Sequence, residues 1–217
     1  MSIHNRNGRT VSTSNLFTNL EKPIIMPLPP AAERTQQHTR TVTCKGFKRQ
    51  DGLWDIEGHL TDIKSGPIAI RERNNGIVEA GEPIHDLSIR ITIDLELNIV
   101  DAVASMDYTP FRICPSIADT YTQLIGIQIA PGFTKKCKEL FSGVNGCTHL
   151  LELLGPVATT AFQATHQERE ARDNWSEGEN RPHTLNTCHT FDTRGDVVRK
   201  YWPHFAEQEA QIKTDSA

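Results

Sequence analysis

A strict alternation of apolar and polar residues from Leu87 to Asn98 constrains the fold more than any other feature of the sequence. Polar or charged side chains fill every second position, and the apolar set between them is Leu87, Ile89, Ile91, Ile93, Leu95 and Leu97. Because successive side chains of a β-strand point to opposite faces, this pattern predicts a strand with one buried and one solvated face. Such strands are typical of antiparallel sheets.

A second alternating run, Leu53–Ile63, predicts another half-buried strand. The pair Asp51-Gly52 directly before it is a common two-residue hairpin turn. The threonine-rich segment Thr39–Lys48 suits a strand on the other side of that turn. The sequence therefore predicts a hairpin over residues 39–63.

The phase of the apolar residues changes after the first run. From Val100 to Tyr108 they occupy even positions, whereas before Asn98 they occupy odd positions. A phase change within one continuous strand would turn its apolar face to water. We therefore expect a hairpin turn or a bulge near Glu96–Asn98, with a further strand after it.

Helices are expected after these strands. A helix opening at Cys114 is indicated by apolar residues at helical spacing, which are Ile117, Tyr121, Leu124 and Ile125. Similar spacing predicts a second helix from Phe133 to Gly143 and a third helix opening at Gly146. Gly155-Pro156 would kink or split this third helix.

Together these elements predict an α+β fold, with an antiparallel sheet from residues 40 to 109 covered on one face by helices from 114 to 165. A late hairpin is expected to turn at Arg194-Gly195 between two short strand-like runs.

The expected domain organisation has three parts. Residues 1–38 are polar and proline-rich, which predicts a disordered or extended N-terminal arm. Residues 39–205 form a single α+β domain, and residues 206–217 form a frayed C-terminal tail.

Charge and composition exclude several classes of partner. The formal net charge of -4 gives no basic surplus to attract phosphates, so nucleic acid and membrane surfaces are disfavoured. The sequence has no apolar run of about 20 residues, and its start lacks the apolar core of a signal peptide. Five cysteines without a C-x-x-C pair fit a reducing compartment. We therefore expect a cytoplasmic protein.

Two cysteines and two histidines form the candidate metal site. Cys114 and Cys147 stand at the starts of predicted helices, where the helix dipole favours a thiolate, and His149 follows the second cysteine. His85 stands just before the long alternating strand. Thiolate and imidazole ligands suit zinc or iron, so we expect one of these metals to be bound. The alternative is that the cysteines are ordinary buried side chains.

Three further residues are candidate catalytic groups. Asp86 adjoins His85, where it could move protons or orient the ring. Glu57 and His59 lie on one strand face and could supply an acid/base pair, although such rows are often only the solvated side of a sheet. Whether Cys188-His189 joins the site is open. The sequence contains none of the standard P-loop, G-x-G-x-x-G, G-x-S-x-G or H-E-x-x-H motifs.

Three blocks of sequence carry a resemblance to a known family. In order they are RTVTCKGFKRQDGLWDIEGHLTDIK, AGEPIHDLSIRITID and NGCTHLLELLGPVATTAFQ. With these blocks the chain resembles, over about residues 39 to 203, a bacterial family catalogued as domain of unknown function 2889 (DUF2889). The resemblance implies a soluble bacterial protein, associated with catabolism of aromatic or other acyl compounds.

A second resemblance concerns architecture. The order of elements from Ile84 to Gly126 is similar to that of iron–sulfur scaffold proteins of the NifU/IscU kind. In that comparison His85 stands in for the first cysteine ligand, Cys114 matches the second, and Cys147 with His149 matches the late pair. Because the first cysteine is missing, the resemblance implies a single zinc or iron ion rather than a cluster.

The leading functional expectation is an enzyme for a small organic substrate, a hydrolase or lyase acting on an aromatic or acyl compound. It would use a mononuclear metal or an activated thiol. The alternative is a metal or iron–sulfur carrier without turnover, and a third option is a structural subunit with inert cysteines. The expected partner is a small-molecule substrate, and assembly into a homo-oligomer is open.

Overall fold

The computed structural model describes residues 3–4, 10–11, 28–175, 178 and 180–207. The chain divides into two units, residues 1–35 and residues 36–217. In the first unit, strands β1 (Ile3–His4) and β2 (Thr10–Val11) pair antiparallel. The remainder of the expected N-terminal arm before residue 28, and the expected tail from residue 208, lie outside the described residues.

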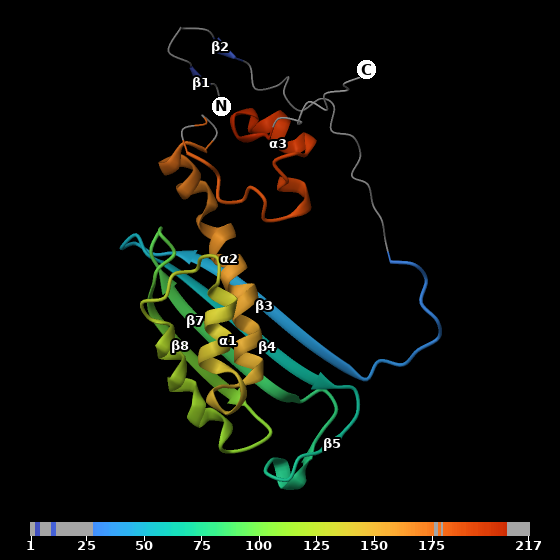
Figure 1. Cartoon of the computed structure of the whole chain (residues 1–217). Coiled ribbons are helices and arrows are strands. Elements are labelled where there is room, and N and C mark those ends of the chain that lie inside the picture. Colours follow the sequence, from blue (N-terminus) through green and yellow to red (C-terminus); the bar gives the residue numbers. More distant parts are fainter. Residues whose placement is uncertain (1–2, 5–9, 12–27, 176–177, 179, 208–217) are drawn as a thin grey trace, which may run out of the picture. The chain divides into compact units, whose positions relative to one another are not determined.

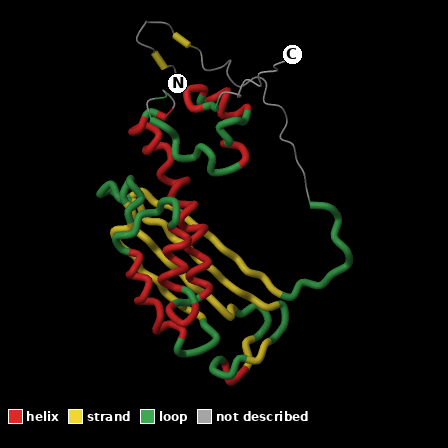
Figure 2. Tube along the Cα trace, in the orientation of Figure 1, coloured by secondary structure: helices red, strands yellow, loops and turns green. Residues whose placement is uncertain are grey.

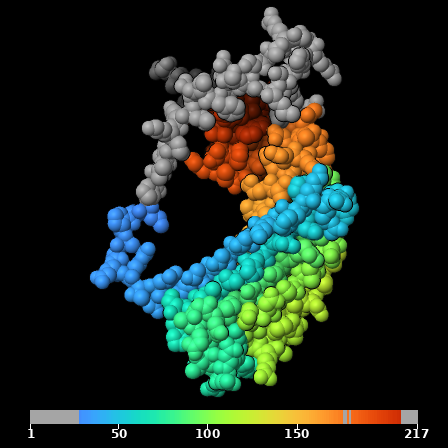
Figure 3. Space-filling model, turned by 180° about the vertical axis from the view of Figure 1, so that it is seen from behind, coloured from blue at the N-terminus to red at the C-terminus, as the bar shows by residue number. Residues whose placement is uncertain are grey.

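The second unit contains a four-stranded antiparallel sheet. Its strands follow one another in chain order, as β3 (His38–Lys48), β4 (Trp54–Lys64), β7 (Pro83–Ile93) and β8 (Ile99–Tyr108). Helices cover one face of this sheet, and the opposite face is open when seen from behind (Figures 1 and 3). The expected α+β class is confirmed.

Two helical segments pack on the sheet, η3 (Cys114–Leu124) and α2 (Thr148–Asp173), and α1 (Phe133–Phe141) packs against both of them. Figure 2 shows how the long α2 crosses the strands. The smaller elements are β5 (Ile68–Ala69), η2 (Asn74–Gly76), β6 (Ile77–Val78), η4 (Gly143–Asn145), η6 (His189–Phe191), α3 (Asp196–Tyr201) and η7 (Pro203–Phe205). No helix in the described part of the chain combines the length and the apolarity needed to cross a bilayer.

The alternation in the sequence determines which face of each strand meets the helices. In β4 and β7 the apolar positions are buried beneath α2. At Gly58 the helix approaches so closely that an added Cβ would lie 2.5 Å from Cγ2 of Val157, and at Gly46 it would lie 2.5 Å from Cβ of Ala164. These glycines therefore set the distance between α2 and the sheet.

The expected turn between the two alternating runs is confirmed, although the first strand ends earlier than its pattern suggests. β7 stops at Ile93, and the following turn is held by Asp94, whose carboxylate accepts the backbone N–H of Asn98 at 2.8 Å. Leu97 adopts a φ of 66° in this turn and is still buried. The alternation continues past the strand because a turn residue also contributes to the core.

One helical expectation needs correction, and one alternative of a second expectation is excluded. The segment from Cys114 is a 3₁₀-helix rather than an α-helix, so its buried residues Tyr121 and Leu124 are three apart and Ile125 is 47% exposed. Helix α2 continues through Gly155-Pro156 without splitting. The packing of both of its halves outweighs the one backbone hydrogen bond that proline removes.

The expectation that two strands flank the late turn is also wrong. The turn is present, but Asp196–Tyr201 forms helix α3, which begins after Gly195. The carboxylate of Asp192 accepts the backbone N–H of Arg194 at 2.9 Å and shapes this turn. A short apolar run such as the one at Val197 has no period that separates a strand from a helix.

Candidate functional site

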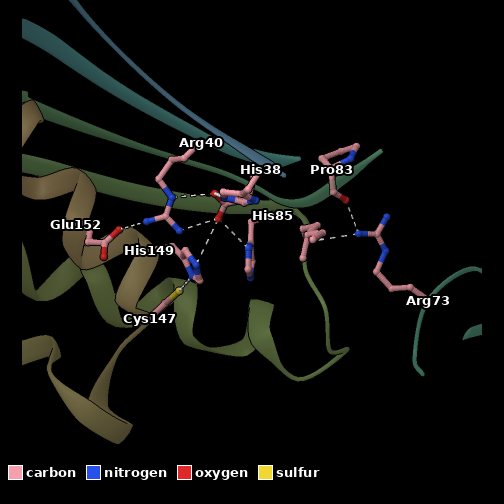
Figure 4. Close-up of polar contacts among 10 residues, drawn as sticks. His38, Arg40, Arg73, Pro83, His85, Cys147, His149 and Glu152 are labelled. Atoms are coloured by element: carbon pink, nitrogen blue, oxygen red, sulfur yellow. Dashed lines mark hydrogen bonds and ion pairs between the residues drawn. The ribbon is translucent and has the colours of Figure 1, made fainter. Parts of the chain in front are cut away.

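The candidate site lies at one end of the sheet, on the face that the helices cover. Strand register places Arg40 opposite Asp62, and Asp62 opposite His85, so the three residues form a row across β3, β4 and β7. The first residues of α2 lie over this row (Figure 4). The site therefore combines three strands with one helix N-terminus.

Asp62 is the centre of the site and only 2% exposed. Arg40 binds its carboxylate with two parallel hydrogen bonds, Nε to Oδ1 and Nη2 to Oδ2, both 2.8 Å long. His38 donates from Nε2 to Oδ1 and His85 from Nδ1 to Oδ2, each at 3.0 Å. Burial opposes ionisation, but the bonds from Arg40 and then His38 outweigh it and lower the pKa of Asp62 to about 2. The group is a carboxylate at neutral pH.

The start of α2 contributes a thiol and an imidazole. His149 lies with Nε2 3.5 Å from Oδ2 of Asp62, and its Nδ1 lies 3.8 Å from Sγ of Cys147. Cys147 is the N-cap residue of the helix. Glu152, one turn further along, forms an ion pair with Nη1 of Arg40 and ties the helix to β3.

Tyr121 fixes the backbone of Cys147. Its hydroxyl donates to the carbonyl of Cys147 at 2.9 Å and accepts the N–H of the same residue at 3.1 Å. The ring is fully buried and stacks on Phe141 at 4.4 Å between centroids. Burial raises the pKa of Tyr121 to about 12, so its hydroxyl stays protonated and keeps both bonds.

The carboxylate also fixes where the proton of His85 lies. An ionised carboxylate can only accept hydrogen bonds, so His85 carries its proton on Nδ1. Burial, and then the neighbouring His149, lower the pKa of His85, which keeps this ring neutral. Nδ1 of His149 faces the thiol of Cys147.

The thiol of Cys147 ionises more readily than an ordinary thiol, because its pKa is lowered. Burial opposes ionisation, but the hydrogen bond with His149 and the backbone N–H groups of Leu150 and His149 outweigh it, so the pKa of Cys147 is lowered. By contrast, burial raises the pKa of Cys137 in α1 to about 11. Of these two thiols, only Cys147 has the environment of a reactive cysteine.

Part of the expected metal site is brought together. Among the described residues, the group whose ligand atoms all lie within 4.8 Å of one another is Asp62, His85 and His149. Two imidazoles and a carboxylate could hold zinc or iron. Cys147 contacts the group through the other nitrogen of His149, and Cys114 is not a member of it.

The expected catalytic residues lie on the opposite face of the sheet. His59 binds Asp86 there, with 2.6 Å between Nε2 and Oδ1. Glu57 lies on the same face, 4.0 Å from Nη1 of Arg90. Because strand residues alternate between faces, these side chains and His85 cannot line one pocket.

Cys188-His189 contributes to a different feature. Both residues line a polar hollow of about 520 Å³ beside Asp192 and Arg194. Neither belongs to the group of ligand atoms around Asp62.

Five residues of the site were not expected from the sequence: His38, Arg40, Asp62, Tyr121 and Glu152. Asp62 had a detectable signal, because it continues the apolar phase of β4 and places a charge where the pattern requires a buried side chain. Arg40 and Glu152 had no such signal, because strand register and helix placement bring them together.

The comparisons with known proteins identify a family but no function. No curated protein and no solved structure gave a significant match. Residues 38–163, more than half of the chain and including every residue of the site around Asp62, match the family described as "Protein of unknown function (DUF2889)". The chain therefore belongs to the DUF2889 family.

Proposed function

We propose that this protein is a small-molecule hydrolase that uses Cys147 as the nucleophile in acyl transfer. The observation that carries the proposal is the continuous chain of contacts from Sγ of Cys147 through both nitrogens of His149 to Asp62. A thiol, an imidazole base and a carboxylate that orients the base are the parts of a nucleophilic triad.

Each residue has a defined role in this reaction. Nδ1 of His149 takes the thiol proton of Cys147, and the sulfur attacks the carbonyl carbon of an ester or thioester. Asp62 stabilises the imidazolium that forms, and His149 then protonates the leaving group. The backbone N–H groups of the first turn of α2 can stabilise the carbonyl oxygen as it becomes negative.

Arg40 favours this mechanism over a metal-dependent one. Its guanidinium already forms a two-bond pair with Asp62 and brings a positive charge beside the carboxylate. A divalent cation would be repelled by this charge. The hydrogen-bonded carboxylate remains suited to orienting His149.

A mononuclear metal enzyme is the second candidate. The clustering of ligand atoms from Asp62, His85 and His149 within 4.8 Å supports it. Zinc or iron there would act as a Lewis acid on a substrate carbonyl. A carrier without turnover would use the same ligands but have no reaction for Cys147.

Three measurements on the full chain separate these functions. Hydrolysis of p-nitrophenyl acetate is expected to depend on Cys147 and to fall at least about 100-fold in Cys147→Ala. Wild-type protein should form an acetyl adduct on this residue, detectable by mass spectrometry. Metal analysis after purification without chelator should find less than stoichiometric zinc and iron. Stoichiometric metal with full activity in Cys147→Ala would instead establish the metal enzyme, and metal without turnover would establish the carrier.

The matched control is Cys137→Ala. Cys137 is a buried cysteine on the apolar face of α1, with its pKa raised rather than lowered. Its replacement should reduce stability but leave the rate per folded molecule unchanged.

A further inference from the structure

A second imidazole stands beside the first on the same carboxylate oxygen. The rings of His85 and His149 have centroids 3.8 Å apart and an interplanar angle of 34°. His85 donates to Oδ2 of Asp62, and Nε2 of His149 lies 3.5 Å from the same oxygen. Figure 4 shows the two rings side by side, with His149 next to Cys147. The site therefore has two imidazoles in contact that face one carboxylate oxygen.

The two rings turn opposite nitrogens toward that oxygen. Nε2 of His149 faces Asp62 and its Nδ1 faces the thiol, whereas His85 donates to Asp62 through Nδ1 and leaves Nε2 as the unprotonated nitrogen. Among the described residues, Nε2 of His85 has no hydrogen-bond or ion-pair partner, and the side chain is 17% exposed. This nitrogen is an available proton acceptor within the site.

His38 shows that contact with Asp62 alone does not create this arrangement. Its ring also donates to the carboxylate, but to Oδ1, on the edge strand β3, and its side chain is 35% exposed. Of the described rings, only His85 packs against the ring of His149. His38 thus provides an internal comparison for the role of His85.

We propose that His85 is the general base for the second half of the reaction, the hydrolysis of the acyl group from Cys147; this rests on the function proposed above. Once the acyl group is on the sulfur, Nδ1 of His149 faces the thioester sulfur. Nε2 of His85 accepts a proton from water, and the resulting hydroxide adds to the thioester carbonyl carbon. The tetrahedral intermediate then breaks its C–S bond, which releases a carboxylic acid and the Cys147 thiolate, and the proton on His85 returns to the sulfur or to solvent.

The test uses two substitutions that keep the hydrogen bond to Asp62. His85→Asn retains a donor near the position of Nδ1 and removes Nε2. His38→Gln retains a donor near the position of Nε2, the nitrogen that this ring uses. With p-nitrophenyl acetate as the probe, the burst of p-nitrophenol reports acylation, the steady state reports turnover, and intact mass reports the acetyl adduct.

We expect His85→Asn to keep a burst within about 3-fold of wild type while its steady-state turnover falls about 100-fold. The acetylated protein should accumulate, and hydroxylamine, which attacks a thioester without a general base, should release it. In His38→Gln the ratio of burst rate to turnover should match wild type.

The other possible results contradict either the role of His85 alone or the thiol mechanism as a whole. If His85→Asn turns over as wild type does, or if its burst and turnover fall by the same factor, His85 is not the base for the second step. In both cases the adduct on Cys147 would still establish the thiol mechanism. If wild type and His85→Asn both fail to form that adduct, the proposed function itself is wrong.

Discussion

At the scale of single residues, the carboxylate of Asp62 decides which nitrogen of His38 and of His85 carries a proton. It can do so because Arg40 and burial hold it in one position as an anion. A carboxylate bound in this way at an apolar strand position stabilises the fold only while its partners remain. The same residue therefore links stability to the chemistry of Cys147 through His149.

Asp62→Asn should lower the free energy of unfolding at pH 7 by about 2 kcal/mol, because Arg40 loses a charged partner and His38 an acceptor. The pKa of Asp62 is about 2 in the folded protein, below the value of about 4 in an unfolded chain. Its stabilisation is therefore complete above pH 4 and is lost as the pH falls toward 2. Urea unfolding should show a difference between wild type and variant that is largest at pH 7 and shrinks below pH 4; a constant difference would contradict this assignment.

The thiol of Cys147 should react with iodoacetamide at a lower pH than an ordinary cysteine, because its pKa is lowered. His149→Gln retains a donor toward Asp62 and removes Nδ1, so it should move the midpoint of the alkylation curve upward. Peptide mapping by mass spectrometry assigns the modified residue, with the exposed Cys188 as the reference thiol. Identical midpoints for Cys147 in wild type and variant would show that the imidazole of His149 does not activate the thiol.

The sequence identifies only part of the site, for a physical reason. His85, Cys147 and His149 stand out because their types and local positions suit chemistry at a strand start and a helix start. Asp86 and His59 look equally suitable, yet a one-residue step along a strand moves a side chain to the opposite face. The face can be assigned only when the register and the covered side of the sheet are known.

At the scale of elements, α2 is held against the sheet by the two glycines, where side chains are absent. Gly58 faces Val157 and Gly46 faces Ala164, so the helix backbone comes close to β4 and β3. This close approach is what places the first turn of α2 over Asp62. The geometry of the site therefore depends on small residues well away from it.

Gly58→Ala should reduce the free energy of unfolding by about 1 to 3 kcal/mol, because the new Cβ would lie 2.5 Å from Cγ2 of Val157. Adding Val157→Ala removes that atom and should recover part of the loss, whereas Val157→Ala alone leaves a cavity. Gly66→Ala is the control, since a Cβ there meets nothing within 4 Å. Chemical denaturation of the four variants is the measurement, and additive losses in the double variant would show that the two positions do not meet.

Elements with a clear period could be predicted from sequence, and those without one could not. The alternation predicts the paired strands and the turn between β7 and β8 because one face is buried along their length. The 3₁₀ form of η3 and the helix α3 follow from contacts and turn hydrogen bonds that no periodicity records. Gly155-Pro156 suggests a kink or a split, and the structure excludes the split because α2 is continuous there.

At the scale of the whole second unit, α2 connects two sets of contacts. Its first turns carry the site, within the part that matches the family, and the helix packs on β3, β4 and β7 as far as Ala164. Beyond residue 163 it supports the C-terminal segment, where His183 lies 4.7 Å from the ring of Trp175 and 5.3 Å from the ring of Phe162. Arg169 lies 5.7 Å from the centres of those same two aromatic rings.

The C-terminal contacts should weaken in mild acid, whereas the contacts of Asp62 hold to lower pH. Burial, followed by the charge of Arg169, lowers the pKa of His183 to about 4, while an unfolded histidine titrates near 6.5. The stabilisation from this neutral ring is complete above pH 6.5 and is lost as the pH falls toward 4, an effect on the order of 2 kcal/mol. Hydrogen-exchange protection of residues 180–207 should therefore fall between pH 7 and pH 5 in wild type and change little in His183→Phe, which keeps the ring contacts without the titrating nitrogen.

Protection of β4 and β7 is the internal reference. If those strands lose protection in parallel with residues 180–207, the two ends of α2 open as one cooperative unit. His183 would then stabilise the whole unit rather than its C-terminal part.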